Sequence, residues 1–167
     1  MSLPSVETLV EKLTQALTPC FSSAESQPVI VGIETGGAWI AEQLQRRIAP
    51  DAELGRLNIS FYRDDFTRKG LHPTVKPSSL PTDIDNRTII LVDDVLQSGR
   101  TVRAAMNEIF DYGRPASIRL AVLVDRSGRE LPIQADVIGT SLSLKEGEHV
   151  KLVGPDPLEL VIQNRPA

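Results

Sequence analysis

The chain has 167 residues, of which 41% are hydrophobic and 24% charged, and this size and composition predict one globular domain spanning 1–167. The formal net charge of −4 excludes a molecule that attracts polyanions over its whole surface, so any nucleic-acid surface would be a local patch. A lone cysteine, Cys20, excludes an internal disulfide, and no long apolar run indicates a signal peptide or a membrane span. We therefore expect a cytoplasmic protein with no membrane partner.

The first half of the chain alternates helical and strand-like patterns. Apolar residues at helical spacing predict an amphipathic helix over 5–17, and the continuously apolar run 28–33 predicts a strand buried on both faces. The turn "ETGG" follows, and apolar residues at every fourth position then predict a helix over 39–48. Alternating apolar and polar residues predict a second strand over 57–62.

The segment from 63 to about 87 shows no sustained periodicity and contains three prolines. A loop of this length is unusual in a compact domain unless it is a binding loop, a lid or disordered. We therefore expect a flexible lid over about 63–87.

The second half continues the alternation. A buried strand is predicted over 88–92, a helix over 101–112 with Gly113 as its C-terminal cap, and a third buried strand over 117–124. Strands that alternate with helices predict an α/β fold with a central, mostly parallel sheet flanked by helices.

Three short strand-like pieces end the chain, at 135–139, 149–153 and 158–162, with "GPDP" as a turn between the last two. Their length and spacing suggest a small antiparallel appendage rather than more of the parallel sheet. We call this appendage the hood and expect it to be formed mainly by 135–163.

Polar residues gather where three of the predicted strands end. They are the turn "ETGG" (34–37), the stretch "DDVLQSGRT" (93–101) and the pair Asp125 and Arg126. Ligands of open parallel sheets bind at the carboxyl ends of the strands, so these segments are expected along one edge of the sheet.

The turn after the second of these strands has the chemistry of a phosphate site. Gly99 lets the backbone approach an anion, Ser98 and Thr101 supply hydroxyl groups, and Arg100 adds a cation. The N-terminal N–H groups of the next helix also favour negative charge.

Asp93 and Asp94 do not suit a phosphate pocket, because carboxylates repel phosphate. They suit the hydroxyl groups of a sugar or a magnesium ion bound to it. A sugar phosphate accounts for the whole stretch, whereas the simpler alternative is that the two aspartates only cap the following helix.

"ILVDDVLQSGRT" resembles the phosphoribosyl pyrophosphate (PRPP) signature of type I phosphoribosyltransferases, and no P-loop motif is present. The stretches "SFYRDDF" (60–66) and 102–139 resemble the PyrR family, whose members are uracil phosphoribosyltransferases that also regulate pyrimidine operons. The resemblance implies the type I phosphoribosyltransferase fold and synthesis of UMP and pyrophosphate from uracil and PRPP.

The resemblance also implies a role for each matching residue. Asp93 and Asp94 would hold the ribose hydroxyls, and Arg126 would contact the base or the pyrophosphate. The 5-phosphate would lie on Val95, Leu96, Gln97, Ser98, Gly99, Arg100 and Thr101. The pyrophosphate would lie on Thr35, Gly36 and Gly37, with Arg63 or Lys69 reaching it from the lid. Mg²⁺ would arrive with PRPP, and Asp93 is the candidate protein ligand.

The expected partners are uracil, PRPP, UMP or UTP, a pyr mRNA leader and further copies of the chain in a dimer or larger homo-oligomer. Many family members carry an arginine where this chain has Gly36, which predicts weaker PRPP binding. An RNA surface could come from Arg46, Arg47, Lys69 or Arg103 clustered in a dimer. The alternative function is a uridine-nucleotide-sensing, RNA-binding attenuator with weak or no catalysis.

A receiver-like signalling domain also gathers carboxylates at strand ends, but it would carry its acidic pair after the first strand, where this chain has "ETGG". Trp39 is expected in the core or a dimer interface, His149 without a ligand role, and Cys20 inert.

Overall fold

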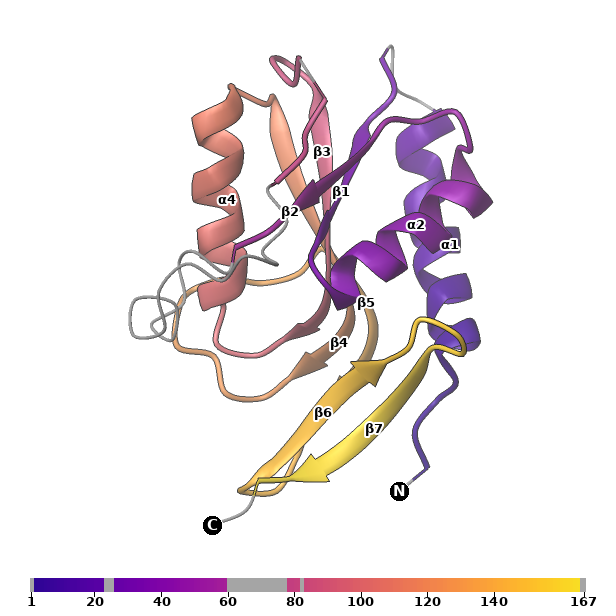
Figure 1. The fold of residues 1–167 in the computed structure, drawn as a ribbon, viewed down its shortest axis with the longest axis vertical. Helices are drawn as coiled ribbons and strands as arrows, with labels where there is room; N and C mark the ends of the chain where they lie inside the picture. Colours follow the sequence, from indigo (N-terminus) through magenta and orange to yellow (C-terminus); the bar gives the residue numbers. More distant parts are fainter. Residues whose placement is uncertain (1, 23–25, 60–77, 82, 166–167) are drawn as a thin grey trace.

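The computed structural model describes residues 2–22, 26–59, 78–81 and 83–165. In this part of the chain no helix is both long enough and apolar enough to cross a membrane. The elements follow in the order α1 (Val6–Ser22), β1 (Val29–Ile33), α2 (Gly36–Ile48), β2 (Leu54–Leu57), β3 (Thr88–Leu96), α4 (Arg100–Tyr112), β4 (Ser117–Arg126), β5 (Val137–Leu142), β6 (Glu148–Val153) and β7 (Glu159–Asn164) (Figure 1).

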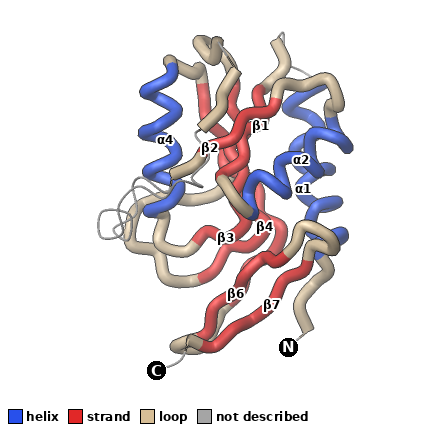
Figure 2. Tube along the Cα trace, viewed as in Figure 1, coloured by secondary structure: helices blue, strands red, loops and turns tan. Residues whose placement is uncertain are grey.

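The main sheet has five strands in the order β2-β1-β3-β4-β5, and every neighbouring pair is parallel. Helices cover both of its faces, with α1 and α2 on one side and α4 on the other (Figure 2). This arrangement confirms the predicted α/β fold.

Side-chain alternation along the strands divides the core into two layers. In β3, for example, Ile90 packs with residues of α1 and α2, whereas its neighbour Leu91 packs with residues of α4. Both side chains are fully buried, as expected for a central strand that is covered on both faces. The sheet is therefore a rigid frame for whatever follows the ends of its strands.

A separate antiparallel hairpin, β6–β7, completes the molecule. The arrowheads of β3 and β4 in Figure 1 point toward this hairpin. Val150 and Leu152 of β6 are buried in the core layer of α1 and α2, which anchors the hairpin to the body. The hairpin thus lies beyond the carboxyl ends of the central strands, where the hood was predicted.

The second strand differs from its prediction. It covers Leu54–Leu57 rather than 57–62, and residues 60–62 lie outside the described part of the chain. Leu57 pairs with Ile33, the last residue of β1, so the ladder ends where its neighbouring strand ends. The alternation that suggested a longer strand includes Asn58 and Ile59, which are buried just after the end of β2.

The first piece of the predicted hood also belongs elsewhere. Residues 137–142 form β5, a parallel edge strand of the main sheet next to β4. Asp136 fixes its start, because its backbone N–H donates to the Leu120 carbonyl while its carboxylate accepts the Leu120 N–H at 2.8 Å. The hood is therefore the hairpin of β6 and β7 alone.

Most of the predicted lid, including Arg63, Lys69 and His72, lies outside the described residues. At the end of the predicted lid segment, Ser79 forms an antiparallel bridge with Arg56, and Ile84 is buried in the core layer of α4. These last residues are therefore packed against the body of the domain.

Candidate functional site: a carboxylate pair between two pockets

Asp93 and Asp94 lie near the end of β3, the central strand of the sheet, which runs four residues beyond the predicted 88–92. Asp93 is 5% exposed, and its Oδ1 accepts the backbone N–H of Asp94 at 2.8 Å. Asp94 is half-buried, and its Oδ1 accepts the N–H of Val95 at 2.8 Å. Each carboxylate is therefore oriented by the backbone of the next residue.

The turn after β3 leads directly into α4. Gly99 is the residue before the helix and has φ 93°, a left-handed conformation that glycine adopts without strain. The hydroxyl of Ser98 accepts the N–H of Arg100 at 3.2 Å, and the carbonyl of Gly99 accepts the N–H of Arg103. The turn thus presents a helix N-terminus next to the carboxylate pair, as the sequence predicted.

A loop that the sequence did not single out holds this turn in place. The N–H groups of Glu130 and Leu131 both donate to the carbonyl of Ser98, each at 3.0 Å. The guanidinium of Arg129 donates to the carbonyl of Gln97 and to the carboxylate of Asp125, both at 2.7 Å. We call residues 127–133 the clasp, since they connect the end of β4 to the turn.

The clasp changes the interpretation of two arginines. The carboxylate of Asp125 pairs with Arg129 and not with Arg126, the next residue in the chain. Arg100 is exposed, pairs with Glu130 at 2.5 Å and does not line either pocket of the site. Its guanidinium is therefore turned away from the predicted phosphate position, and only its backbone belongs to the turn.

The first of the two pockets has a volume of about 290 Å³ and lies between the turn and the hood. It is lined by 93–99, Thr101, Val102, Arg126 and 149–151. Apart from Arg100, all residues predicted to bind the 5-phosphate are thus brought together on one wall. His149, for which no ligand role was expected, lies on the opposite wall.

The second pocket, of about 450 Å³, lies between the end of β1 and the hood. It is lined by 33–36, Trp39, 93–95, Thr101, Lys151 and Leu152. Thr35 and Gly36 are placed here as expected, and the peptide bond between Glu34 and Thr35 is cis. Asp93, Asp94 and Lys151 line both pockets, so they mark the junction between them.

We call the turn 34–37 after β1 the first loop. Its two glycines, Gly36 and Gly37, have different neighbours. A Cβ atom added to Gly36 would lie 2.2 Å from Oδ2 of Asp94, so this glycine makes room for the carboxylate. A Cβ atom on Gly37 would lie 2.5 Å from the carbonyl oxygen of Val92 in β3. Gly37 therefore allows α2 to pack on the central strand and lines neither pocket.

Arg126 extends from the end of β4 to the hood. Its Nη1 donates to the carbonyl of Glu148 at 3.2 Å and lies 3.5 Å from Nδ1 of His149. Its Nε is buried and has no hydrogen-bond partner among the described residues. A buried donor at the wall of a pocket is costly unless a ligand or water satisfies it, which supports a ligand contact here.

Comparison with known proteins identifies the family of this chain. The family model of the phosphoribosyl transferase domain matches residues 5–155. The "Bifunctional protein PyrR" of Nitrosococcus oceani is 56% identical over 162 residues, which cover 95% of this chain and 92% of that protein. The protein of the same name from Pseudomonas paraeruginosa is 54% identical, with 96% and 95% covered.

Solved structures show the same fold at low identity. The hypoxanthine phosphoribosyltransferase of Trypanosoma cruzi matches with a TM-score of 0.66 at 16% identity, covering 96% of this chain and 93% of that one. Such a match concerns the fold alone. Taken with the family model and the near full-length matches above half identity, it leads to one conclusion: this chain belongs to the PyrR family of phosphoribosyl transferase domain proteins.

Proposed function

We propose that this protein is a uracil phosphoribosyltransferase, which forms UMP and pyrophosphate from uracil and PRPP, and that it also regulates pyrimidine biosynthesis genes. The observation that carries the proposal is the carboxylate pair of Asp93 and Asp94 at the junction of two pockets, one beside a helix N-terminus. A ribose bearing phosphate groups on two sides fits a junction of this kind.

In this proposal the ribose hydroxyls donate hydrogen bonds to the carboxylates of Asp93 and Asp94. The 5-phosphate lies in the first pocket on the turn 95–99, and the pyrophosphate lies in the second pocket beside Thr35 and Gly36. The base lies toward the hood, where Nε of Arg126 can donate to a carbonyl oxygen of uracil.

The reaction forms a bond between N1 of uracil and C1 of the ribose while the bond from C1 to the pyrophosphate oxygen breaks. Pyrophosphate leaves with the bonding electron pair, and the N1 proton passes to solvent. The ribose ring carries positive charge in the transition state, as in glycoside chemistry. The carboxylates of Asp93 and Asp94 stabilise that charge because they are held close to the sugar by the backbone of β3.

The side chains present fit a magnesium ion that arrives with PRPP. No cluster of three or more potential metal ligands occurs among the described residues, so an all-protein cage is not formed there. Mg²⁺ commonly binds through one or two carboxylates and the phosphates of a substrate, and Asp93 and Asp94 offer such a pair. When bound, the ion would neutralise charge on the pyrophosphate leaving group.

The preference of the protein for uracil is tested by a transferase assay with PRPP and Mg²⁺, in which uracil, hypoxanthine, guanine and orotate are compared as substrates. We expect release of pyrophosphate with uracil and at least tenfold lower rates with the other three, because a site built for one set of base hydrogen bonds rejects others strongly. Turnover of a purine without turnover of uracil would overturn the assignment.

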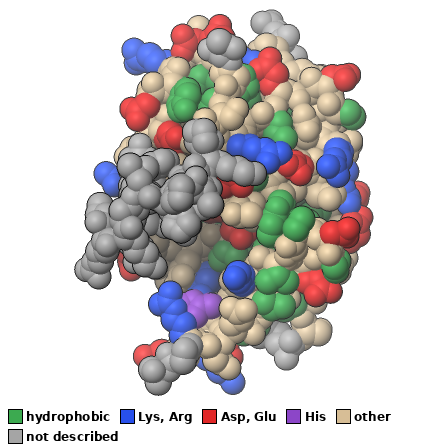
Figure 3. All heavy atoms as spheres, in the orientation of Figure 1, with side chains coloured by type: hydrophobic (Ala, Val, Ile, Leu, Met, Phe, Trp, Pro, Cys, Tyr) green, Lys and Arg blue, Asp and Glu red, His purple; other side chains and the backbone are tan. Residues whose placement is uncertain are grey.

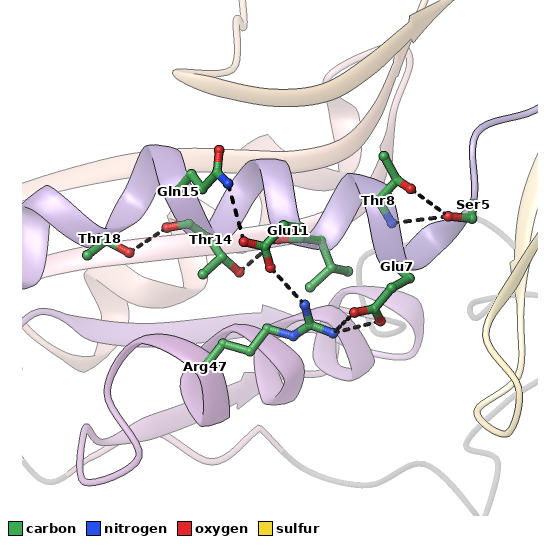
Figure 4. Close-up of polar contacts among 9 residues, drawn as sticks. Ser5, Glu7, Thr8, Glu11, Thr14, Gln15, Thr18 and Arg47 are labelled. Carbon is green, nitrogen blue, oxygen red and sulfur yellow. Dashed lines mark hydrogen bonds and ion pairs between the residues drawn. The ribbon is translucent and has the colours of Figure 1, made fainter.

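A second candidate function is RNA binding controlled by a uridine nucleotide, and the arginines proposed for it are partly occupied. Figure 4 shows Arg47 of α2 between Glu7 and Glu11 of α1, at 2.7 and 3.3 Å. Arg46 and Arg103 are exposed but lie on helices that cover opposite faces of the sheet. Within one copy these three described arginines form no common basic surface, so an RNA surface built from them would need a dimer or larger oligomer.

RNA binding is checked by measuring the affinity for a pyr leader transcript with and without UMP or UTP at two salt concentrations. We expect nucleotide-dependent binding that weakens steeply with salt, because phosphate contacts release counterions. A transcript that binds no better than an unrelated RNA of equal length would leave only the enzyme.

A further inference from the structure

We infer that Lys151, on the hood, supplies the cation that binds the pyrophosphate group of PRPP. This inference rests on the proposed function and adds a residue that the sequence pattern did not indicate. It follows from the charges that line the two pockets, from the surroundings of Gly36 and from the way the hood hairpin is anchored.

The site contains few cations for a highly anionic substrate. Besides the aspartate pair, Glu34 also lines the second pocket, and its Oε1 lies 3.7 Å from Nη1 of Arg56. Among the lysine and arginine residues that the structure describes, only Arg126 and Lys151 line either pocket. Figure 3 shows Lys and Arg side chains gathered beside a His side chain next to the hood. PRPP binding needs positive charge, and these two residues are its described sources.

Of these two cations, Arg126 is already engaged. Its guanidinium donates to the carbonyl of Glu148, and it lines only the first pocket. Lys151 lines both pockets, and its ammonium group forms no ion pair or hydrogen bond with any residue that the structure describes. Lys151 is thus an uncommitted cation at the junction that contains the carboxylate pair.

The first loop cannot supply this charge in the observed geometry. Gly36 has no side chain, and Asp94 occupies the space that a Cβ atom would need. Thr35 is exposed and neutral. A cation for the second pocket must therefore come from another element, and Lys151 faces this loop across the pocket.

The hairpin holds Lys151 in a defined position. Its neighbours in β6, Val150 and Leu152, are 8% and 4% exposed and pack into the core layer of α1 and α2. Side chains alternate along a strand, so Lys151 projects on the same side of β6 as His149, whose ring lies 3.5 Å from Arg126 at the wall of the first pocket. Its backbone pairs with Val161 of β7, which fixes the register.

The experiment compares Lys151→Met and Lys151→Arg with Lys145→Met, because Lys145 is exposed, lies just before β6 and lines neither pocket. Loss of a binding cation is expected to raise the KM for PRPP at least tenfold in Lys151→Met, with kcat changed much less. Lys151→Arg should recover most of the loss, and Lys145→Met should match the wild type. All three should melt within a few degrees of the wild type, since exposed side chains contribute little stability.

Product inhibition shows which phosphate group of PRPP the ammonium group of Lys151 binds. In Lys151→Met we expect the inhibition constant of pyrophosphate to rise at least tenfold and that of ribose 5-phosphate to change less than threefold. Any of three results would overturn the inference: equal effects on both inhibitors, an unchanged KM for PRPP, or a Lys151→Arg variant that does not restore binding. A wild-type protein that turns over none of the four bases would instead overturn the proposed function, so the two failures are distinguishable.

Discussion

Replacement of Asp94 by asparagine is expected to lower the turnover of uracil and PRPP by about 100-fold, the usual effect of removing one group that stabilises transition-state charge. The amide has nearly the same shape, and its oxygen can still accept the N–H of Val95, so the local backbone is retained. The melting temperature should therefore stay within a few degrees of the wild type. Steady-state kinetics and a thermal melt on the same preparation check both parts.

Asp111→Asn is the matched control, because Asp111 is exposed on α4 and lines neither pocket. It should keep wild-type kinetics. If Asp94→Asn retains wild-type turnover, the carboxylate pair has no part in the mechanism.

Gly36→Ala is the second substitution with a large expected effect. The new Cβ atom would lie 2.2 Å from Oδ2 and 2.7 Å from Cγ of Asp94, so the carboxylate has to move. A displacement of about 1 Å in a catalytic group can cost about 100-fold in rate, and we expect a loss of that order in kcat. Stability should be retained, since the obstacle is a side chain and alanine is the better helix former.

Gly37→Ala separates this effect from general damage. Its Cβ atom would lie 2.5 Å from the carbonyl oxygen of Val92, and the backbone of a central strand cannot move to relieve this clash. Overpacking of this kind costs about 1–3 kcal/mol, so Gly37→Ala should lower the melting temperature clearly. The interpretation of Gly36 fails if Gly36→Ala is fully active, or if it loses stability as Gly37→Ala does.

The end of β1 could be predicted from the sequence, and the end of β3 to within four residues, because their signals are local. A buried aliphatic run followed by Asp93 and Asp94 and then by a glycine turn indicates the end of a strand and the start of a helix in one stretch. The parallel arrangement then brings Thr35 and Gly36 to the same edge as the aspartates, as the structure shows.

The direction of individual side chains could not be predicted in the same way. Arg100 follows a phosphate-binding pattern, yet its guanidinium pairs with Glu130, a residue thirty positions later. The sequence around Lys151 did not indicate a binding role for this residue either, since a single lysine in a short strand is common on protein surfaces. Both outcomes depend on contacts between distant segments, which periodicity and spacing do not contain.

The clasp has a consequence for the thermodynamics of ligand binding. The clasp donates hydrogen bonds to the carbonyls of Gln97 and Ser98, so contacts within the protein itself hold the turn after β3 in shape. Ordering a flexible loop costs about 1–2 kcal/mol per residue in conformational entropy, and a turn that is already fixed avoids this cost on binding. The affinity for the 5-phosphate end of a ligand is therefore built into the folded protein through residues that never touch the ligand.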